Sequence, residues 1–505
     1  MNLSELLAYQ SRKYPSKEGL VTLDDRITYA QWNQAVNQLA KALQRLGVNQ
    51  NDKVVIHMSN TKEFVITYFA VQRIRAVAVP INAKFVFEEV SYIFNHCDGK
   101  VFLTDDLLFD QVSSLSEIYD GIFIKTKDSA DGWLAFDELL QAEESSEVVS
   151  DANEEEEASI LYTSGTTGKP KGVVFTHKNI LAVASMMAVE MEMKPSSRML
   201  HMMPLSHSAP LHLFLIGGTY VGATHVLAPT FSPDLLLELV SKERTTHFFG
   251  APVAYLMTAK HPKVTETDLS WMKSWVYGGA PLSQSEVQFV QDQLDIDHLY
   301  CVYGLTEAGP NGTLLMPQEH ASKAGSIGQR AALNCEIRLV DSEGQDVKPG
   351  EVGEILLKGE GNMKGYYKDE EQTEKAFRNR WLYTGDMAFK DNDGFFWVVD
   401  RKKDIIISGG LNIYPRETET NLLEHPHITD VALVGVPHPD WGETVKAFII
   451  QDGTIEDIEA ECRQYLHARL ADYKIPRLYE EVTELPRNAT GKLLKNKLRE
   501  KARQV

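Results

Sequence analysis

Short apolar runs alternate with segments of helical periodicity through the first hundred residues. Residues 54–58, 77–80 and 101–103 are short, apolar and rich in β-branched side chains, which is typical of buried strands. Between them, residues 28–46 begin at an N-cap threonine, repeat apolar side chains every three or four positions, and stop at Gly47. This alternation is the pattern of a parallel sheet covered by helices on both faces, so we expect an α/β fold with doubly wound sheets.

The same alternation resumes beyond an acidic, Ser- and Glu-rich segment at residues 143–157, which we interpret as a solvated loop. Strands are expected at residues 246–249, 275–277 and 299–302. The last two run directly into glycine-rich segments. Ligands of open α/β sheets bind beyond the carboxyl ends of the strands, so these segments are candidate site loops.

From about Cys335 onward the sequence contains mainly strand patterns separated by turn residues, and a further turn is expected at residues 383–386. A charged stretch at residues 400–404 then precedes about a hundred residues of mixed strand and helix pattern. We place the domain boundary in this stretch. The expected organisation is an N-terminal domain over residues 1–402, which includes a β-rich subdomain, and a small mobile α+β domain over residues 403–505.

Charge and composition limit the classes of partner. Lys and Arg number 51 against 71 Asp and Glu, a net charge of −20, which argues against nucleic acid and against a polybasic membrane anchor. No uncharged apolar run reaches about 18 residues, so no membrane-spanning helix is expected. Residues 1–10 lack the basic region of a secretory signal, and the four scattered cysteines contain no C-x-x-C pair. We expect a cytoplasmic protein.

A glycine- and hydroxyl-rich segment, YTSGTTGKPKG at residues 162–172, is the strongest candidate for a ligand site. Its three glycines let the backbone pass close to a ligand, and its hydroxyls and lysines add hydrogen-bond donors and positive charge. This is the donor set that a polyphosphate needs. The segment is not a Walker A loop, because Thr163 stands where the first glycine is required and Pro170 follows Lys169.

Five motifs in order resemble the acyl-adenylate-forming superfamily, which contains acyl-CoA synthetases, adenylation domains of peptide synthetases, and luciferases. They are YTSGTTGKPKG at 162–172, YGLTE at 303–307, YTGD at 383–386, DRKKD at 400–404 with Gly409 and Gly410, and TGK at 490–492. The resemblance covers essentially the whole chain. It implies that a carboxylate attacks the α-phosphate of ATP to give acyl-AMP and pyrophosphate, and that the thiol of CoA then displaces AMP.

The resemblance implies an ATP and AMP site built from several loops. The residues are Thr163, Ser164, Gly165, Thr166, Thr167, Gly168, Lys171, Gly279, Ala280, Pro281, Val302, Tyr303, Gly304, Asp386, Arg401 and Lys403. The first loop would hold the β- and γ-phosphates. Asp386 can accept hydrogen bonds from both ribose hydroxyls and Arg401 can reinforce them, although a turn carboxylate that caps its own backbone is the structural alternative for Asp386.

Metal and catalytic roles follow from the same resemblance. Glu307, on an otherwise apolar turn, is the natural oxygen ligand for Mg²⁺, and Thr163 is the second residue assigned to the metal. Thr306 would hydrogen-bond the α-phosphate. His207 would lie beside the acyl carboxylate, but Ser206 replaces the aromatic residue that commonly precedes this histidine, so the usual gating of the pocket is not assumed.

The small domain is expected to serve both half-reactions. Lys492 would reach into the site and bridge the carboxylate and the α-phosphate during adenylation. Rotation about a hinge at Lys403 would then withdraw Lys492 and bring in the strand of Gly409 and Gly410 to line the CoA tunnel.

The substrate and acceptor are less constrained. The segments expected at the acyl pocket consist of apolar or small residues and contain no arginine that could bind a second carboxylate of the substrate. They also contain no acidic residue that could bind a substrate ammonium except Asp234, which is predicted to begin a helix. A monocarboxylic, fatty acid is therefore favoured. The alternatives are a stand-alone enzyme that loads a carrier protein in trans, a kinase-like phosphotransferase, and an inactive binding module, which would be expected to lose Glu307, Asp386 or Lys492. The oligomeric state is open, with a homodimer as one option.

Overall fold

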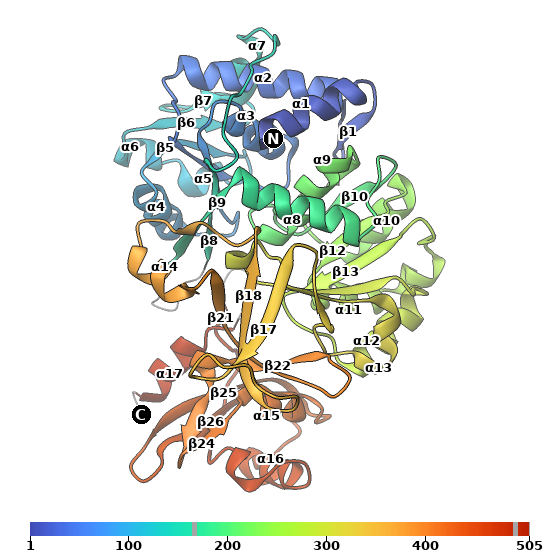
Figure 1. Cartoon of the computed structure of the whole chain (residues 1–505), viewed down its shortest axis with the longest axis vertical. Helices are drawn as coiled ribbons and strands as arrows, with labels where there is room; N and C mark the ends of the chain where they lie inside the picture. The colour runs from blue at the N-terminus through green and yellow to red at the C-terminus, as the bar shows by residue number, and fades with distance from the viewer. Residues whose placement is uncertain (164–168, 488–492, 504–505) are drawn as a thin grey trace. The chain divides into compact units, whose positions relative to one another are not determined.

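The computed structural model describes residues 1–163, 169–487 and 493–503. The chain forms two compact units. The first comprises Met1–Ile337 with Leu357–Leu382, and the second comprises Arg338–Leu356 with Tyr383–Val505 (Figure 1). The predicted boundary between residues 1–402 and residues 403–505 was placed at an expected hinge. A single structure does not show hinge motion, so this boundary stays a prediction.

The first unit contains an eight-stranded sheet in the order β19-β9-β8-β4-β3-β5-β6-β7. Its strands are β3 (Lys53–His57), β4 (Val77–Pro80), β5 (Gly99–Thr104), β6 (Ile122–Lys125), β7 (Leu134–Ala135), β8 (Glu157–Thr163), β9 (Lys171–Thr176) and β19 (Gly365–Tyr366). The run from β8 to β7 is parallel, whereas β9 pairs antiparallel with both β8 and β19. The hairpin of β8 and β9 therefore carries the glycine-rich segment.

A nine-stranded sheet in the same unit has the order β16-β15-β14-β13-β12-β10-β11-β1-β2. Its strands are β1 (Glu18–Val21), β2 (Arg26–Thr28), β10 (Arg198–His201), β11 (Thr224–Leu227), β12 (His247–Gly250), β13 (Ser274–Gly278), β14 (Leu299–Tyr303), β15 (Thr313–Leu315) and β16 (Arg330–Ala331). The strands from β14 to β1 are parallel. Two sheets with parallel centres and helical crossovers confirm the expected α/β, doubly wound fold.

Helices surround these sheets, and α1, α2 and α3 pack against one another near the N-terminus (Figure 1). The helices are α1 (Leu3–Lys13), α2 (Tyr29–Arg45), α3 (Lys62–Arg73), α4 (Phe87–His96), α5 (Phe109–Val112), α6 (Leu115–Ile118), α7 (Phe136–Gln141), α8 (His177–Glu190), α9 (Gly217–Val221), α10 (Pro233–Glu243), α11 (Pro252–Ala259), α12 (Gln284–Leu294), α13 (His320–Lys323) and α14 (Glu370–Ala376), with a π-helix at Ala209–Ile216. No helix of the described ranges is long and apolar enough to cross a membrane.

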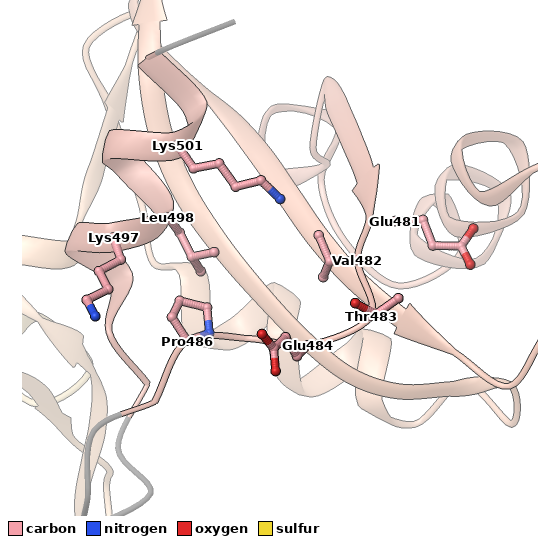
Figure 2. Close-up of a pocket in the computed structure, with 8 residues that line it drawn as sticks. All are labelled: Glu481, Val482, Thr483, Glu484, Pro486, Lys497, Leu498 and Lys501. Atoms are coloured by element: carbon pink, nitrogen blue, oxygen red, sulfur yellow. The ribbon is translucent and has the colours of Figure 1, made fainter.

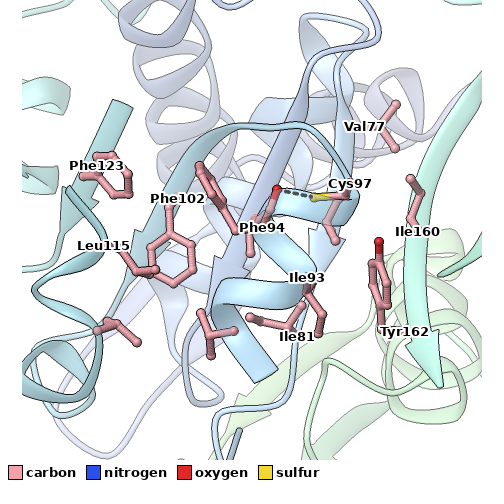
Figure 3. Close-up of a cluster of buried hydrophobic side chains, with 14 of the residues drawn as sticks. Val77, Ile81, Ile93, Phe94, Cys97, Phe102, Leu115, Phe123, Ile160 and Tyr162 are labelled. Atoms are coloured by element: carbon pink, nitrogen blue, oxygen red, sulfur yellow. Dashed lines mark hydrogen bonds between the residues drawn. The ribbon is translucent and has the colours of Figure 1, made fainter. Parts of the chain in front are cut away.

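Aromatic side chains fill the core between α4 and the eight-stranded sheet (Figure 3). Phe94 on α4 meets Phe102 on β5 edge to face, with ring centroids 5.9 Å apart. A Cβ added at Gly99 would lie 2.4 Å from the Phe94 ring, so a side chain larger than hydrogen would displace this ring. The core thus fixes the position of β5, and through it the neighbouring strands β3 and β6.

The second unit holds a separate five-stranded sheet in which β24-β23-β26-β25 follow one another and β27 pairs with β26. Its strands are β23 (Ile406–Ser408), β24 (Leu411–Ile413), β25 (Ile428–His438), β26 (Gly442–Gln451) and β27 (Leu478–Glu481), and its helices are α15 (Pro415–Leu423), α16 (Ile458–His467) and α17 (Lys495–Arg503). An apolar core joins α15 and α16 to this sheet, through Leu422, Leu433, Ala447 and Leu466 among others.

A third sheet corrects one prediction. It consists of β17 (Cys335–Val340), β18 (Val352–Gly359), β20 (Phe377–Arg378), β21 (Trp381–Lys390) and β22 (Phe396–Arg401). Residues 383–386 were expected to form a turn, but they lie inside β21, where Asp386 pairs with Arg401 of β22. Gly385 has φ +71°, a conformation that favours glycine, and it directly precedes Asp386, where the ladder with β22 begins.

Candidate active site

Both ends of the glycine-rich segment are anchored in the eight-stranded sheet. Thr163 ends β8, Lys171 begins β9, and the two residues pair across the hairpin. The Lys171 ammonium lies 5.3 Å from the centre of the Tyr366 ring. Five residues assigned to the phosphates, Ser164, Gly165, Thr166, Thr167 and Gly168, lie outside the described residues. The hairpin ladder therefore fixes where this loop leaves and rejoins the sheet.

The two glycine-rich loops after β13 and β14 lie side by side. The strands are parallel neighbours, with Gly278 opposite Val302. A Cβ at Gly278 would lie only 2.7 Å from the carbonyl oxygen of Val302, which shows how closely the backbones approach. Gly279 has φ +84°, a conformation that favours glycine. The structure thus brings Gly279, Ala280 and Pro281 to the same sheet edge as Val302, Tyr303 and Gly304.

Glu307 lies on a short 3₁₀ turn, Thr306–Ala308, just beyond β14. The Tyr366 hydroxyl donates a hydrogen bond of 2.9 Å to Glu307 Oε1. The Glu307 carbonyl accepts a bond of 2.8 Å from the Met363 amide. The Thr306 hydroxyl lies 3.3 Å from the hydroxyl of Ser208. Main chain and side chain of Glu307 are therefore both held by the segment that contains β19.

The donor set around Glu307 fits Mg²⁺. Among the described residues, no group of three or more His, Cys, Asp or Glu side chains could hold a metal ion by itself. Mg²⁺ is commonly bound by one or two carboxylates, with waters and substrate phosphates completing its shell. Glu307 offers such a carboxylate: Oε1 accepts the Tyr366 bond, and no hydrogen bond or ion pair joins Oε2 to another of the described residues. Thr163, at the end of β8, offers a hydroxyl of the type Mg²⁺ also accepts.

His207 is partly buried and lies just before the π-helix. Burial lowers its pKa to about 4, so the imidazole is neutral at pH 7. Its Nε2 lies 3.4 Å from Nδ2 of Asn82. Ser206 is buried, and its hydroxyl has no hydrogen-bond partner among the residues described. A neutral His207 can donate one hydrogen bond to a carboxylate, but it carries no charge to attract one.

Asp386 and Arg401 form an ion pair in the second unit. Arg401 Nε lies 2.6 Å from Asp386 Oδ1, and the Asp386 side chain is only 6% exposed. The Asp386 amide donates to the Thr384 hydroxyl at 3.1 Å. The carboxylate therefore has a cationic partner where β21 meets β22, and its role at the ribose stays a prediction.

Lys403 belongs to the 3₁₀ turn Lys402–Asp404 that follows β22. Its carbonyl accepts a bond of 3.4 Å from Arg499, whose guanidinium also pairs with Asp404 at 2.6 Å. Helix α17 therefore holds the segment of the predicted hinge.

Gly409 and Gly410 correct a second prediction. They were expected within a strand, but they form the two-residue turn between β23 and β24. Both have positive φ, +57° and +81°, as a tight hairpin turn of this length requires. The Gly409 amide donates to the Trp441 carbonyl at 2.9 Å, so the turn is tied to the neighbouring hairpin. Lys492, assigned to catalysis, lies outside the described residues.

A pocket of about 520 Å³ opens in the second unit between the end of β27 and α17 (Figure 2). Its lining includes acidic Glu481 and Glu484, basic Lys497 and Lys501, and apolar Leu498. None of its lining residues was assigned to the site, and we give it no role.

Sequence reasoning missed Tyr366, Asn82 and Ser208, each of which contacts an assigned residue. Tyr366 lies 59 positions from Glu307, and no local pattern connects the two. The only available signal was the pair of tyrosines after Gly365, which is weak because aromatic residues are common in strands.

Comparisons with known proteins agree with this geometry. Residues 7–367 match the AMP-binding enzyme family, and residues 417–492 match the C-terminal domain of AMP-binding enzymes. The chain is 34% identical to feruloyl-CoA synthase of an Amycolatopsis species, over 94% of this chain and 93% of that protein. It is 32% identical to the long-chain fatty acid–CoA ligase FadD13 of Mycobacterium tuberculosis, over 99% and 98% of the two chains.

Among solved structures, ATP-bound MatB from Rhodopseudomonas palustris matches with a TM-score of 0.88 and 27% identity, over 99% of both chains. Sequence families, full-length relatives and fold thus lead to the same assignment. The chain belongs to the AMP-binding enzyme family and so to the acyl-adenylate-forming superfamily that its motifs resemble.

Proposed function

We propose that the protein is an AMP-forming acyl-CoA synthetase. It would convert a carboxylic acid and ATP to acyl-AMP and pyrophosphate, and then transfer the acyl group to CoA. The observation that carries the proposal is the match to both family domains, on a chain that retains Glu307, Asp386 and Lys492. Full-length relatives that are named CoA ligases favour CoA as the acceptor.

In the first half-reaction, a carboxylate oxygen bonds to the α-phosphorus while the bond from that phosphorus to the pyrophosphate oxygen breaks. The loop of Ser164, Gly165, Thr166, Thr167 and Gly168, with Lys171, would hold the leaving pyrophosphate. Mg²⁺, held by Glu307 and Thr163, would neutralise phosphate charge. Thr306 would orient the α-phosphate, and neutral His207 would lie beside the carboxylate. Lys492 would bridge the two anionic groups as they approach.

The nucleoside would be held at two places. The strand-end loops, with Gly279, Ala280 and Pro281 on one side and Val302, Tyr303 and Gly304 on the other, would take the adenine, because their glycines let a flat ring approach the backbone. Asp386 would accept hydrogen bonds from the ribose hydroxyls. Arg401 would support it, and Lys403 would complete the nucleotide contacts.

In the second half-reaction, the CoA sulfur bonds to the acyl carbon, AMP leaves with the electrons of the acyl–oxygen bond, and the thiol loses its proton. We propose that residues 403–505 rotate about Lys403 between the two steps. Lys492 would then leave the site, and the turn of Gly409 and Gly410 would line the path of CoA. Because both residues of this turn are glycines, it carries no side chains, which leaves room for a narrow thiol-bearing chain.

We propose a fatty monocarboxylic acid as the substrate. Asp234, the one acidic residue near the expected pocket segments, lies in the first turn of α10 and pairs with Lys263 at 2.8 Å. Its carboxylate is therefore already paired with a cation of this chain. The named relatives act on both aromatic and fatty acids, so chain length and ring content are the variables to test. A cytoplasmic location, where ATP and CoA are available, and a homodimer complete the proposal.

The test is a panel of carboxylic acids with ATP and Mg²⁺, assayed with and without CoA. With CoA we expect pyrophosphate, AMP and acyl-CoA in equal amounts, and without CoA we expect pyrophosphate together with acyl-AMP. Acid-dependent pyrophosphate without acyl-CoA would instead indicate a carrier protein as acceptor. Formation of ADP without pyrophosphate would contradict the proposal.

A further inference from the structure

Tyr366 joins three segments that are far apart in the sequence. Its hydroxyl bonds to Glu307, its backbone pairs with β9, and its ring lies under Lys171. From this arrangement we propose that Tyr366 is a positioning residue, which orients the Glu307 carboxylate toward the metal and couples it to the phosphate-binding hairpin. The inference rests on the proposed function, because it concerns the metal that accompanies ATP.

The first step concerns the carboxylate. A glutamate on a 3₁₀ turn can rotate about its side-chain torsions, and only one range of orientations presents an oxygen to a metal. The bond of 2.9 Å from Tyr366 to Oε1 removes that freedom and leaves Oε2 for the metal. Because the Met363 amide also fixes the Glu307 carbonyl, the residue is held at both its main chain and its side chain.

The second step concerns the direction of the bond. The phenol hydroxyl of Tyr366 is the donor and Glu307 Oε1 is the acceptor. A carboxylate has two oxygens that can accept or ligate, so the bond to Oε1 occupies one oxygen and does not compete for the lone pairs of Oε2.

The third step concerns the rigidity of Tyr366 itself. In the antiparallel pair of β19 and β9, Tyr366 lies opposite Val173. Its amide donates to the Thr373 hydroxyl at 2.8 Å. The side chain thus projects from a strand that is bonded on both sides, and its position follows that of β9.

The fourth step concerns the hairpin. Lys171 pairs with Thr163 at the base of the glycine-rich segment, and its ammonium lies 5.3 Å from the Tyr366 ring centre. A cation over an aromatic face is attracted by the ring. One side chain therefore contacts both the proposed metal ligand and the strand that carries the proposed phosphate loop.

The test is Tyr366→Phe, which removes the hydroxyl and keeps the ring under Lys171. Tyr367→Phe is the matched control, because its hydroxyl bonds to Asp98 at 3.1 Å and touches no assigned residue. Calorimetric titration with ATP over a range of Mg²⁺ concentrations, without acid, measures the metal requirement of nucleotide binding directly. We expect the half-saturating Mg²⁺ concentration to rise roughly tenfold in Tyr366→Phe, the size of one lost hydrogen bond to a charged group, and to be unchanged in Tyr367→Phe.

A double-mutant cycle with Glu307→Gln separates positioning from general damage. If Tyr366 acts through Glu307, Tyr366→Phe adds little to the metal requirement once Glu307 is replaced. Additive effects, or an Mg²⁺ dependence of Tyr366→Phe equal to that of the wild type, would overturn the inference. If the wild type binds MgATP but releases no pyrophosphate with any acid, the proposed function fails while the titration still decides the role of Tyr366.

Discussion

Replacing Asp386 with asparagine tests the ribose assignment with the shape of the side chain preserved. The Asp386 side chain is 6% exposed and pairs with Arg401 at 2.6 Å. Arg401 is 39% exposed, so water can solvate its guanidinium once the partner charge is gone. The main loss in Asp386→Asn should therefore appear in nucleotide binding rather than in folding.

The size of that loss follows from hydrogen-bond energies. A bond to a charged acceptor contributes about 1.5–3 kcal/mol and a bond to a neutral acceptor about 0.5–1.5 kcal/mol. Exchanging carboxylate for amide thus weakens each ribose bond by about 1–1.5 kcal/mol. For two hydroxyls the sum is about 2–3 kcal/mol, which is roughly a 30- to 150-fold rise in the Kd for ATP.

The assay is calorimetry with ATP and with 2′,3′-dideoxy-ATP, without acid so that no turnover occurs. The wild type should bind ATP far more tightly than the dideoxy analogue, and in Asp386→Asn this preference should shrink by roughly 30- to 150-fold, because the substitution weakens binding of ATP but not of the analogue. Asp400→Asn is the control, because Asp400 is similarly buried but accepts its bonds from the amides of Arg401 and Arg416. If Asp386→Asn weakened both ligands by the same factor, the ribose assignment would be refuted.

Three further predictions concern the lid, the fold and pH. Lys492→Ala should abolish acyl-AMP formation yet still convert supplied acyl-AMP to thioester, and equal loss in both half-reactions would contradict the two-state lid. Glu243, which receives hydrogen bonds from Arg26 and Arg198, should stabilise the first unit, so Glu243→Gln should lower the free energy of unfolding by about 1.5–3 kcal/mol in urea titrations; an unchanged midpoint would count against it. Burial lowers the pKa of five histidines to between about 3 and 4, and these are His57, His177, His201, His207 and His212. Between pH 6.5 and 4 the unfolded chain binds protons that the folded chain does not, so each histidine should lower the stability by up to about 1.4 kcal/mol per pH unit as the pH falls; a melting temperature that does not fall over this range would contradict the assignment of these residues as buried and neutral.

Local signals in the sequence predicted the local structure well. The Thr28 hydroxyl accepts a hydrogen bond of 3.2 Å from the Gln31 amide and so caps α2, as the N-cap pattern predicts. The predicted strand at residues 77–80 coincides with β4, because a short valine-rich run between two helices is typical of a buried strand. The β-strands before the two glycine loops were also predicted, since apolar residues followed by glycine mark both the strand and its end.

Features that depend on distant partners were not predictable. A tyrosine–threonine–glycine–aspartate run suggests a turn, yet residues 383–386 lie inside β21, whose ladder with β22 begins at Asp386 and Arg401. The order of the nine-stranded sheet places β10 between β11 and β12, and no local pattern encodes that choice. The support of Glu307 by Tyr366 is likewise a tertiary contact. The motifs therefore predicted which side chains belong to the candidate site. The residues that orient these side chains, such as Tyr366, could be identified only from the folded structure.

The most direct test of the central claim is a single assay of the purified protein with ATP, Mg²⁺, CoA and a series of fatty and aromatic acids, in which AMP, pyrophosphate, ADP and acyl-CoA are all quantified. Our account predicts AMP, pyrophosphate and acyl-CoA in equal amounts with the preferred acid, and no ADP. Nucleotide turnover that is independent of acid, or that yields ADP, would contradict it.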